Sequence, residues 1–284
     1  MPAPKTARTI AEILSVKPRS ISIADIGAAY YGQKPVYKSL LDASVARLYA
    51  FDADDKQASE LRTLYPNETI FQHAIADGAD HTLYVCPAGM TSLLEPDPEA
   101  LAFFNSFSEW GKVEKTIPVK TRKLDDIAEL PDVDFLKIDI QGTELMALKD
   151  GRKKLAQCVA IQIEVSFVTL YKNQPAFGEV DVELRAQGFV PHCFAELKQW
   201  SIAPTIRDGD PRVPFRQLLE ADLVYVRNVI KVSELSSEQL RKLAVIAHFC
   251  YTSPDLVVRC IIELQKRKDA PAGAAQEYLT GLSA

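Results

Sequence analysis

The chain has 284 residues, 47% hydrophobic and 25% charged, which suits one large α/β domain with an appendage and excludes a mainly disordered protein. Its formal net charge of −5 argues against a general phosphate-binding surface, so we expect no nucleic-acid partner. No segment reaches the roughly 18 to 20 apolar residues of a membrane span, and the apolar patch at residues 10–14 is too short for a secretory signal. We therefore expect a cytoplasmic protein.

The cysteines and histidines do not have the spacing of a metal or redox site. The five cysteines are widely separated, include no Cys-x-x-Cys pair, and are expected to be reduced thiols: Cys86, Cys158, Cys193, Cys250 and Cys260. The four histidines also lack ligand spacing: His73, His81, His192 and His248. Asp139 and Glu164 are able in principle to share a divalent cation with water, but the sequence gives this little support, and we expect no metal.

Helices and strands alternate through the first part of the chain. Helices are predicted at residues 6–16, 38–46 and 54–65, the first closed by Pro18 and the third by Pro66. Strands are predicted at residues 21–26, 48–52 and 69–74, with residues 82–86 as a sheet extension or one arm of a hairpin.

Residues 87–118 form a long connection that contains several prolines and a group of aromatic residues. A long connection inside a compact domain is often functional or mobile, so we interpret it as a substrate loop or lid, although a plain surface excursion is nearly as good an account. The aromatic residues fit stacking against a sugar, an aromatic ring or a lipid, and equally fit packing under a lid: Phe103, Phe104, Phe107 and Trp110.

The second part continues the alternation and ends in a different pattern. Strands are predicted at residues 133–140, 159–165, 189–194 and 221–226, and helices at residues 143–155 and 175–187. The last two strands resemble the antiparallel end of a mixed sheet in a doubly wound α/β fold. A helical hairpin at about residues 233–268 follows, so we divide the chain into residues 1–232 and 233–284. The hairpin either covers the domain or pairs subunits, and its apolar faces favour a homodimer.

Three strands end in an acid, and the carboxyl ends of parallel strands are where open α/β sheets bind ligands. Asp25 precedes Gly27, where a backbone without a side chain lets a ligand approach closely, but Gly-x-Gly-x-x-Gly is absent. Asp52 ends the second strand and is placed to accept hydrogen bonds from both hydroxyls of a ribose. A helix cap for Asp25 and a solvated strand end for Asp52 are the structural alternatives; together the two acids favour a nucleoside cofactor.

Asp139 ends the strand that carries Lys137, and the two share one face of that strand. The functional reading places Asp139 beside the reacting centre, with Lys137 and Glu164 adjusting its charge. The alternative for Lys137 is an ion pair with a neighbouring acid. Glu144 begins the next helix, where a cap is its simplest account. His73 follows the third strand, where it is able to flank an adenine or act as a base, although a lone histidine there is more often neither.

These motifs, in this order, resemble the FkbM-type methyltransferases over roughly residues 20–230. The resemblance is carried by Leu124-Asp125-Asp126, by residues 134–144 with Leu148-Lys149-Asp150-Gly151, by Ile163-Glu164-Val165-Ser166-Phe167 with Leu170-Tyr171 and Phe177-Gly178-Glu179, and by residues 221–226. It implies a Rossmann-like class I methyltransferase fold, with a mixed, mostly parallel seven-stranded sheet covered by helices on both faces. It also implies S-adenosylmethionine as methyl donor and an acceptor hydroxyl on a sugar, polysaccharide or natural product.

The resemblance also implies positions for the cofactor. The cofactor-binding residues would be Asp25, Gly27, Ala28, Ala29, Asp52, Ala53, His73, Ala74 and Asp139, with residues 74–77 at the adenine edge. The first motif departs from the family, because Ala29-Tyr30-Tyr31-Gly32 replaces a polar residue and a nearer glycine, which implies a differently shaped methionine end. The segment after residue 232 lies outside the resemblance.

The chemistry expected is transfer of a methyl group from a sulfonium, in which the protein aligns donor and acceptor and removes a proton from the acceptor hydroxyl. Asp139, or Glu164 close by, is expected to take that proton. Two other functions stay open: a non-catalytic S-adenosylmethionine-binding or assembly protein, and a nicotinamide oxidoreductase. The absence of the dinucleotide glycine pattern and of a well-placed Tyr-x-x-x-Lys dyad argues against the last.

Overall fold

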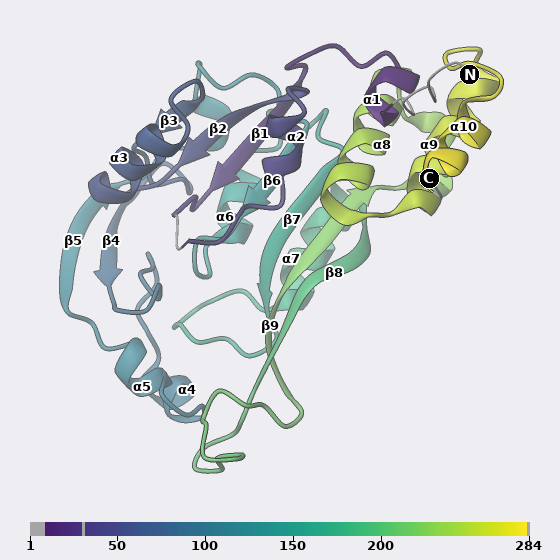
Figure 1. The fold of residues 1–284 in the computed structure, drawn as a ribbon. Helices are drawn as coiled ribbons and strands as arrows, with labels where there is room; N and C mark the ends of the chain where they lie inside the picture. Colours follow the sequence, from purple (N-terminus) through teal and green to yellow (C-terminus); the bar gives the residue numbers. More distant parts are fainter. Residues whose placement is uncertain (1–8, 30–31, 283–284) are drawn as a thin grey trace.

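The computed structural model describes residues 9–29 and 32–282 and is built around one seven-stranded sheet (Figure 1). The strand order is β3-β2-β1-β6-β7-β9-β8. The strands are β1 Ile21–Ile26, β2 Ala46–Phe51, β3 Thr69–Phe71, β6 Phe135–Ile138, β7 Ala160–Ser166, β8 Phe189–Trp200 and β9 Gln217–Arg227. Adjacent strands are parallel from β3 to β7, whereas β9 is antiparallel to both β7 and β8. The predicted mixed, mostly parallel sheet with an antiparallel end is confirmed.

Helices cover both faces of the sheet, because strand side chains alternate between two apolar clusters. Ile21 and Ile23 of β1 belong to the cluster that includes α1, α2, α3 and the C-terminal helices, whereas Ala24 and Ile26 belong to the cluster under α6 and α7. The helices are α1 Ile10–Ile13, α2 Lys38–Asp42, α3 Asp55–Leu64, α6 Glu144–Lys149, α7 Phe177–Ala186, α8 Ser237–Tyr251, α9 Pro254–Lys266 and α10 Ala274–Leu282. Two short 3-10 turns lie at Leu124–Asp126 and Val229–Glu234.

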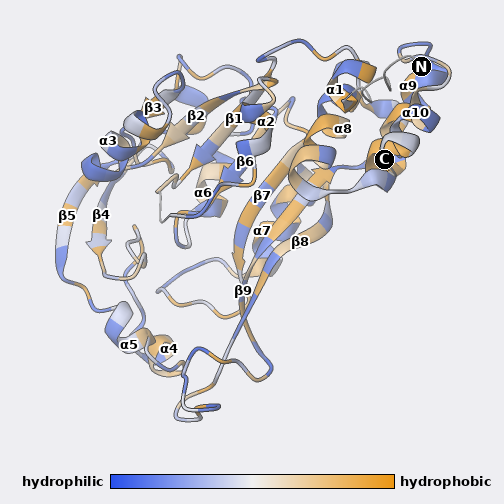
Figure 2. Ribbon diagram, viewed as in Figure 1, coloured by the Kyte–Doolittle hydropathy of each residue, from blue (hydrophilic) through white to orange (hydrophobic). Residues whose placement is uncertain are grey.

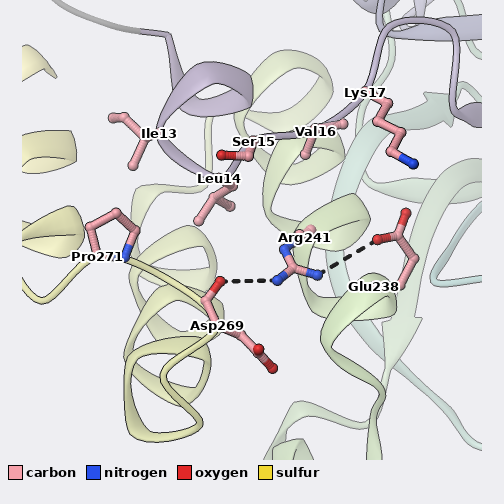
Figure 3. Close-up of a pocket in the computed structure, with 9 residues that line it drawn as sticks. All are labelled: Ile13, Leu14, Ser15, Val16, Lys17, Glu238, Arg241, Asp269 and Pro271. Atoms are coloured by element: carbon pink, nitrogen blue, oxygen red, sulfur yellow. Dashed lines mark hydrogen bonds and ion pairs between the residues drawn. The ribbon is translucent and has the colours of Figure 1, made fainter.

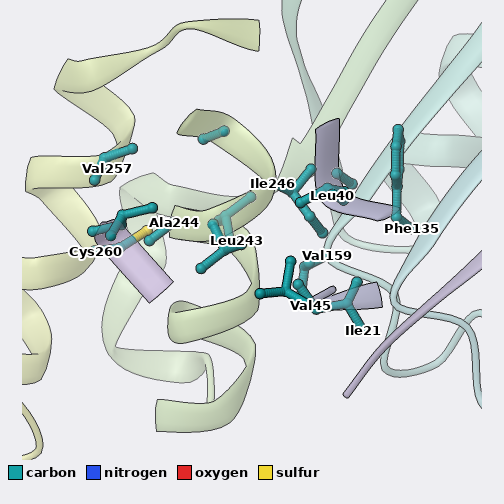
Figure 4. Packing of buried hydrophobic residues seen from close by; sticks show 14 of the residues in the cluster. Ile21, Leu40, Val45, Phe135, Val159, Leu243, Ala244, Ile246, Val257 and Cys260 are labelled. Atoms are coloured by element: carbon teal, nitrogen blue, oxygen red, sulfur yellow. The ribbon is translucent and has the colours of Figure 1, made fainter. Parts of the chain in front are cut away.

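The C-terminal helices pack against the sheet as part of its core (Figure 4). Ser236 caps α8 in a capping box with Gln239, and the buried stripe of α8 includes Leu243 and Ile246, which lie in one cluster with Phe135 of β6. The predicted helical hairpin is confirmed, and its apolar faces are buried within this chain. The sequence reading did not predict α10. The expected division at residue 232 stays a prediction.

Several predicted boundaries were wrong. The first helix is only Ile10–Ile13, and residues 6–8 lie outside the described part of the chain. The helix expected at residues 143–155 ends at Lys149. Two residues further, Gly151 packs so tightly that a Cβ at this position would be 2.9 Å from Leu124 Cδ2. Strand β3 stops at Phe71, which is its last residue paired with β2. Strand β8, in contrast, continues to Trp200 through register shifts against β9.

The long connection is largely ordered secondary structure. We call residues 80–120 the arm: β4 Asp80–Val85 and β5 Lys115–Lys120 pair antiparallel, with α4 Pro98–Ala102 and α5 Phe107–Trp110 between them. Residues 82–85 therefore belong to one strand of an antiparallel pair, as expected for one side of a hairpin. Figure 1 shows the arm curving from β3 to the far end of β8 and β9. There Phe104 and Phe107 are buried, and Phe107 lies 5.3 Å from Trp200 between ring centroids, so packing explains these two aromatics.

Apolar residues are concentrated in β7, β9 and α8 (Figure 2). No helix in the described residues has both the length and the apolar character that crossing a membrane would require.

A buried ion pair fastens α8 to the sheet, and its removal should cost stability. Lys242 Nζ lies 2.9 Å from Asp134 Oδ2, at the start of β6, and that oxygen also accepts the Ser22 N–H at 2.8 Å. In Lys242→Met the buried carboxylate loses its counter-charge, so we expect the free energy of unfolding to fall by about 3 kcal/mol. Lys266→Met on α9 should cost less than about 1 kcal/mol, because Lys266 is exposed and its partner Glu263 keeps an ion pair with Arg267 at 3.1 Å. Urea unfolding compares the two, and equal losses would refute the assignment.

Candidate active site

The turn after β1 and the end of β6 touch at the carboxyl edge of the sheet. Gly27 has φ +80°, and a Cβ at this position would lie 1.8 Å from the carbonyl oxygen of Asp139. The Asp139 N–H donates to the Ile26 carbonyl at 3.0 Å, and the Gly27 N–H donates to Phe51 of β2 at 3.0 Å. Only glycine allows this approach, which brings the candidate cofactor turn against Asp139.

Asp25 and Lys137 face each other across β1 and β6. The parallel register pairs the two residues directly, and Lys137 Nζ lies 3.5 Å from Asp25 Oδ1. The other oxygen, Oδ2, accepts the Tyr37 hydroxyl at 2.6 Å. Burial alone would lower the pKa of Lys137, but the charges of Asp25 and Asp139 raise it above its usual value. The ion pair considered as an alternative for Lys137 is therefore present, and sequence reading missed Tyr37.

Asp25 Oδ1 is fully buried and has no hydrogen-bond donor among the described residues. The carboxyl is only 3% exposed, and at 3.5 Å the lysine supplies charge without a hydrogen bond of normal length. A buried acceptor in this condition is costly unless a further group satisfies it. The turn that follows, at Gly27, is the nearest place where a ligand would approach.

Asp52 follows β2 and is half-buried. Its Oδ1 accepts the Asp54 N–H at 2.8 Å, and burial raises its pKa to about 6. Ala53 beside it is also half-buried, and in the first turn Ala28 is buried and Ala29 half-buried. Tyr30 and Tyr31, the departures from the family pattern, lie outside the described residues.

His73 and Ala74 lie after β3, beside Arg122 in the segment that follows β5. The His73 Nε2 is 2.9 Å from Nη1 of Arg122, and its ring stacks on Phe71 with centroids 6.0 Å apart. The carbonyl of Ala74 accepts the Arg122 N–H at 2.9 Å. These contacts fix the segment expected at the adenine edge. Arg122 is a contact that the sequence reading did not anticipate.

Gln141 joins Asp139 to Glu164. Its amide nitrogen donates to Asp139 Oδ1 at 3.0 Å and to Glu164 Oε2 at 2.9 Å. Asp139 is half-buried, and no described residue donates a hydrogen bond to its Oδ2. Glu164 is 7% exposed, and its pKa is well above the usual value because of burial and the nearby charge of Asp139. The structure thus brings together two of the three predicted catalytic residues through a glutamine that sequence reading missed.

Glu144 completes a group of three acids. Single carboxylate oxygens of Asp139, Glu144 and Glu164 lie within 4.8 Å of one another. Glu144 accepts the backbone N–H of Ile140 at 2.8 Å and of Gly142 at 3.0 Å, so it stabilises the turn before α6 and does not cap the helix as expected. Burial raises its pKa to about 7. N–H donors hold oxygens of all three acids, whereas Asp139 Oδ2 receives no hydrogen bond from the described residues, so the group is a hydrogen-bonded carboxylate cluster with one open acceptor.

Two pockets lie away from these acids. One of about 410 Å³ lies between α1, α8 and the segment after α9, where Arg241 Nη2 donates to the Asp269 carbonyl at 3.0 Å (Figure 3). Its walls include residues 13–17, which precede β1, so it is at the opposite edge of the sheet from Asp139. The other, of about 400 Å³, lies where Trp200 and Phe215 meet at the end of the β8–β9 hairpin.

Comparison with known proteins identifies a family model. The model described as the methyltransferase FkbM domain matches residues 25–191, more than half of the chain. Comparison with curated proteins found no match.

Solved structures provide distant matches. An FkbM methyltransferase from Methylobacillus flagellatus KT is 16% identical with a TM-score of 0.37, over 73% of this chain and 43% of its own. This chain therefore spans less than half of that protein. The magnesium protoporphyrin IX methyltransferase of Synechocystis PCC 6803, with bound SAM, is 12% identical over 77% and 76% of the two chains, with a TM-score of 0.35. TYW2 of M. jannaschii, in complex with AdoMet, is 12% identical over 80% and 78%, with a TM-score of 0.32.

The contact at Gly27 predicts an unusually costly glycine substitution. In Gly27→Ala the new methyl group would overlap the Asp139 carbonyl, so we expect a loss of at least about 3 kcal/mol in the free energy of unfolding. Gly209→Ala is the matched control, because Gly209 has φ +75° and no atom within 4 Å of its Cβ position; it should cost about 1 kcal/mol. Urea unfolding measures both. Similar losses would mean that backbone strain, and not the Asp139 contact, sets the cost.

Proposed function

Because the chain belongs to the FkbM family of S-adenosylmethionine-dependent methyltransferases, we propose that it methylates a hydroxyl group of a sugar, polysaccharide or natural-product acceptor. The observation that carries this proposal is the contact between the Gly27 turn and Asp139. It places the half-buried turn at Gly27 against a half-buried carboxylate at the carboxyl edge of the sheet, where such folds bind their ligands.

The residues at this edge fit S-adenosylmethionine. Gly27 allows a tight turn against Asp139, Asp25 offers a buried carboxylate oxygen that receives no hydrogen bond from the described residues, and Asp52 offers a half-buried carboxylate for the ribose hydroxyls. We assign Ala28, Ala29 and Ala53 to the walls around the cofactor, and His73 and Ala74 to its adenine end. When bound, the sulfonium supplies an electrophilic methyl group.

Asp139 is the residue we assign as the base. Its Oδ1 is held by Gln141, whereas no described residue donates to Oδ2, which leaves this oxygen to accept a hydrogen bond from the acceptor hydroxyl. With the donor bound, the Asp139 carboxylate would take the proton of the hydroxyl as its oxygen is methylated, and would later release it to solvent. Lys137 places a positive charge beside Asp139, and Glu164, whose pKa is raised by burial and by the nearby charge of Asp139, is poised to hold a proton next to it.

The charge around Asp139 favours an acceptor without an anionic group next to the reacting hydroxyl. Even without Glu144 and Glu164, whose pKa values are raised by burial, the described residues place four acids against two lysines here: Asp25, Asp139, Glu220 and Asp222 against Lys137 and Lys198. Lys198 is already paired, at 2.6 Å from Glu220 and 3.4 Å from Glu164. A carboxylate or phosphate on the acceptor would meet this excess of acids, whereas a neutral sugar or natural-product alcohol would not.

Affinity for S-adenosylmethionine should fall when Asp52 takes up a proton. A carboxyl with its pKa raised to about 6 is ionised above pH 6 and protonated below it, so it offers two charged acceptor oxygens to the ribose hydroxyls only on the alkaline side. We expect the dissociation constant to increase up to about tenfold between pH 7.5 and pH 5. Asp52→Asn should bind about tenfold to a hundredfold more weakly at pH 7.5, with no change near pH 6, and exposed Asp55→Asn should match the wild type. Calorimetric titration checks this, and a pH dependence retained in Asp52→Asn would contradict it.

Asp139→Asn should separate binding from turnover. The amide cannot accept the proton, so we expect the rate of methyl transfer to fall by about a hundredfold or more while donor affinity stays within about threefold. The assay offers labelled S-adenosylmethionine with a panel of neutral glycosides and polyhydroxylated alcohols, and exposed Asp132→Asn is the control. Undiminished turnover would remove Asp139 as the base. If the wild type binds the donor yet methylates none of the panel, the non-catalytic binding protein becomes the better account.

A further inference from the structure

Gln141 has a backbone conformation that needs support. It has φ +55° in the turn after β6 and is followed by Gly142 with φ +102°. A residue with a side chain rarely occupies this left-handed region, and such strain is retained mainly at functional sites. The hydroxyl of buried Ser92, in the arm, donates to the Gln141 carbonyl at 2.6 Å. The arm therefore helps to hold the turn in this conformation.

Both donors and the acceptor oxygen of the Gln141 side chain make hydrogen bonds. Both amide hydrogens are directed to carboxylates, those of Asp139 and Glu164, and the amide oxygen accepts the Tyr171 hydroxyl at 3.0 Å. Tyr171 is 4% exposed and packs in the cluster formed by the arm and the β8–β9 hairpin. The tyrosine thus fixes the direction of the amide, with its oxygen away from the acids and its nitrogen toward them.

A neutral donor at this position has a distinct chemical consequence. It holds the two acids at one spacing and adds no charge of its own, whereas a glutamate would add a negative charge, and a methionine would leave Asp139 without a donor among the described residues and Glu164 with Lys198 alone, at 3.4 Å. One oxygen of Asp139 is thereby fixed, and the other is left for a substrate.

We propose that Gln141 is a positioning residue of this active site: it holds Asp139 with Oδ2 toward the acceptor hydroxyl, keeps Glu164 beside it, and connects both acids to the arm through Tyr171 and Ser92. This assignment rests on the proposed function for its acceptor, but the arrangement of the two acids is testable without one. The charged and titratable groups facing the pair are Asp25 of β1, Lys137 of β6, Glu144 of α6, Lys198 of β8, Glu220 and Asp222 of β9, and Tyr171.

The first test is a titration that needs no substrate. Carbon-13 NMR of side-chain carboxyl groups is followed against pH in the whole protein, and the Asp139 signal is identified by its loss in Asp139→Asn. In Gln141→Glu the added carboxylate should raise the titration midpoint of Asp139 by at least one pH unit. Gln276→Glu, the same change on the exposed side of α10, should leave it unchanged. An unaltered midpoint in Gln141→Glu would overturn the proposal.

Gln141→Met provides a second variant of similar size without charge. It removes both N–H donors, so the Asp139 midpoint should rise here too, by less than in Gln141→Glu. If Gln141→Glu does not fold, Gln141→Met still decides the question, because it removes the donors without adding charge. A rise in Gln141→Glu with no change in Gln141→Met would show that added charge alone acts, and would overturn the positioning assignment.

Turnover gives an independent readout. With labelled S-adenosylmethionine and the neutral acceptor panel, Gln141→Met should lower kcat at least tenfold while KM for the donor stays within about twofold, and Tyr171→Phe should give a smaller loss in the same direction. An unchanged kcat would overturn the proposal. If the wild type transfers no methyl group to the panel, the proposed function fails, but the carboxyl titration still tests Gln141.

Discussion

The contact between Gly27 and the Asp139 carbonyl is the constraint on which the site depends. The loops that follow two parallel strands leave the sheet at the same edge. Side chains on these loops would keep the two backbones apart beyond the strand ends. Here the missing side chain lets the turn after β1 lie against the end of β6, and the hydrogen bonds from Asp139 to Ile26 and from Gly27 to Phe51 hold three strands together at that point. A backbone surface open to a ligand and an acid are thereby fixed within one turn of each other.

Around this contact the fold keeps charged groups at an edge that is otherwise apolar. Asp25 is buried but is matched by Lys137 and by the Tyr37 hydroxyl, and Glu164 is buried but is matched by Gln141 and Lys198. Uncompensated burial of this many acids would destabilise the sheet. The site is therefore a network in which each acid has an assigned partner, with Asp139 as the half-buried member.

The sequence predicted what depends on strand and helix periodicity. The alternation of residues 21–26 was sufficient to predict the sheet, and the acids that end β1, β2 and β6 were sufficient to predict its carboxyl edge. Both predictions follow from local sequence patterns. The partners of those acids were not predictable in this way. Tyr37, Gln141 and Tyr171 come from loops whose contacts depend on tertiary packing, and a glutamine with positive φ has no local sequence signature. The short helices of the arm were not predicted for the same reason: they pack against Trp200, about ninety residues further along the chain.

The antiparallel strand β9 has a consequence for how the molecule is made. It lies between β7 and β8, so the strand that carries Glu164 has no neighbour on one side until residues 217–227 have left the ribosome. Synthesis of β1, β2 and β6 therefore gives a nascent half-sheet with an open edge, a form that is exposed to pairing with other chains. Glu220 and Asp222 of β9 join the acids of the earlier strands only in the last quarter of translation, which makes this stretch the interval in which a chaperone would have most to protect.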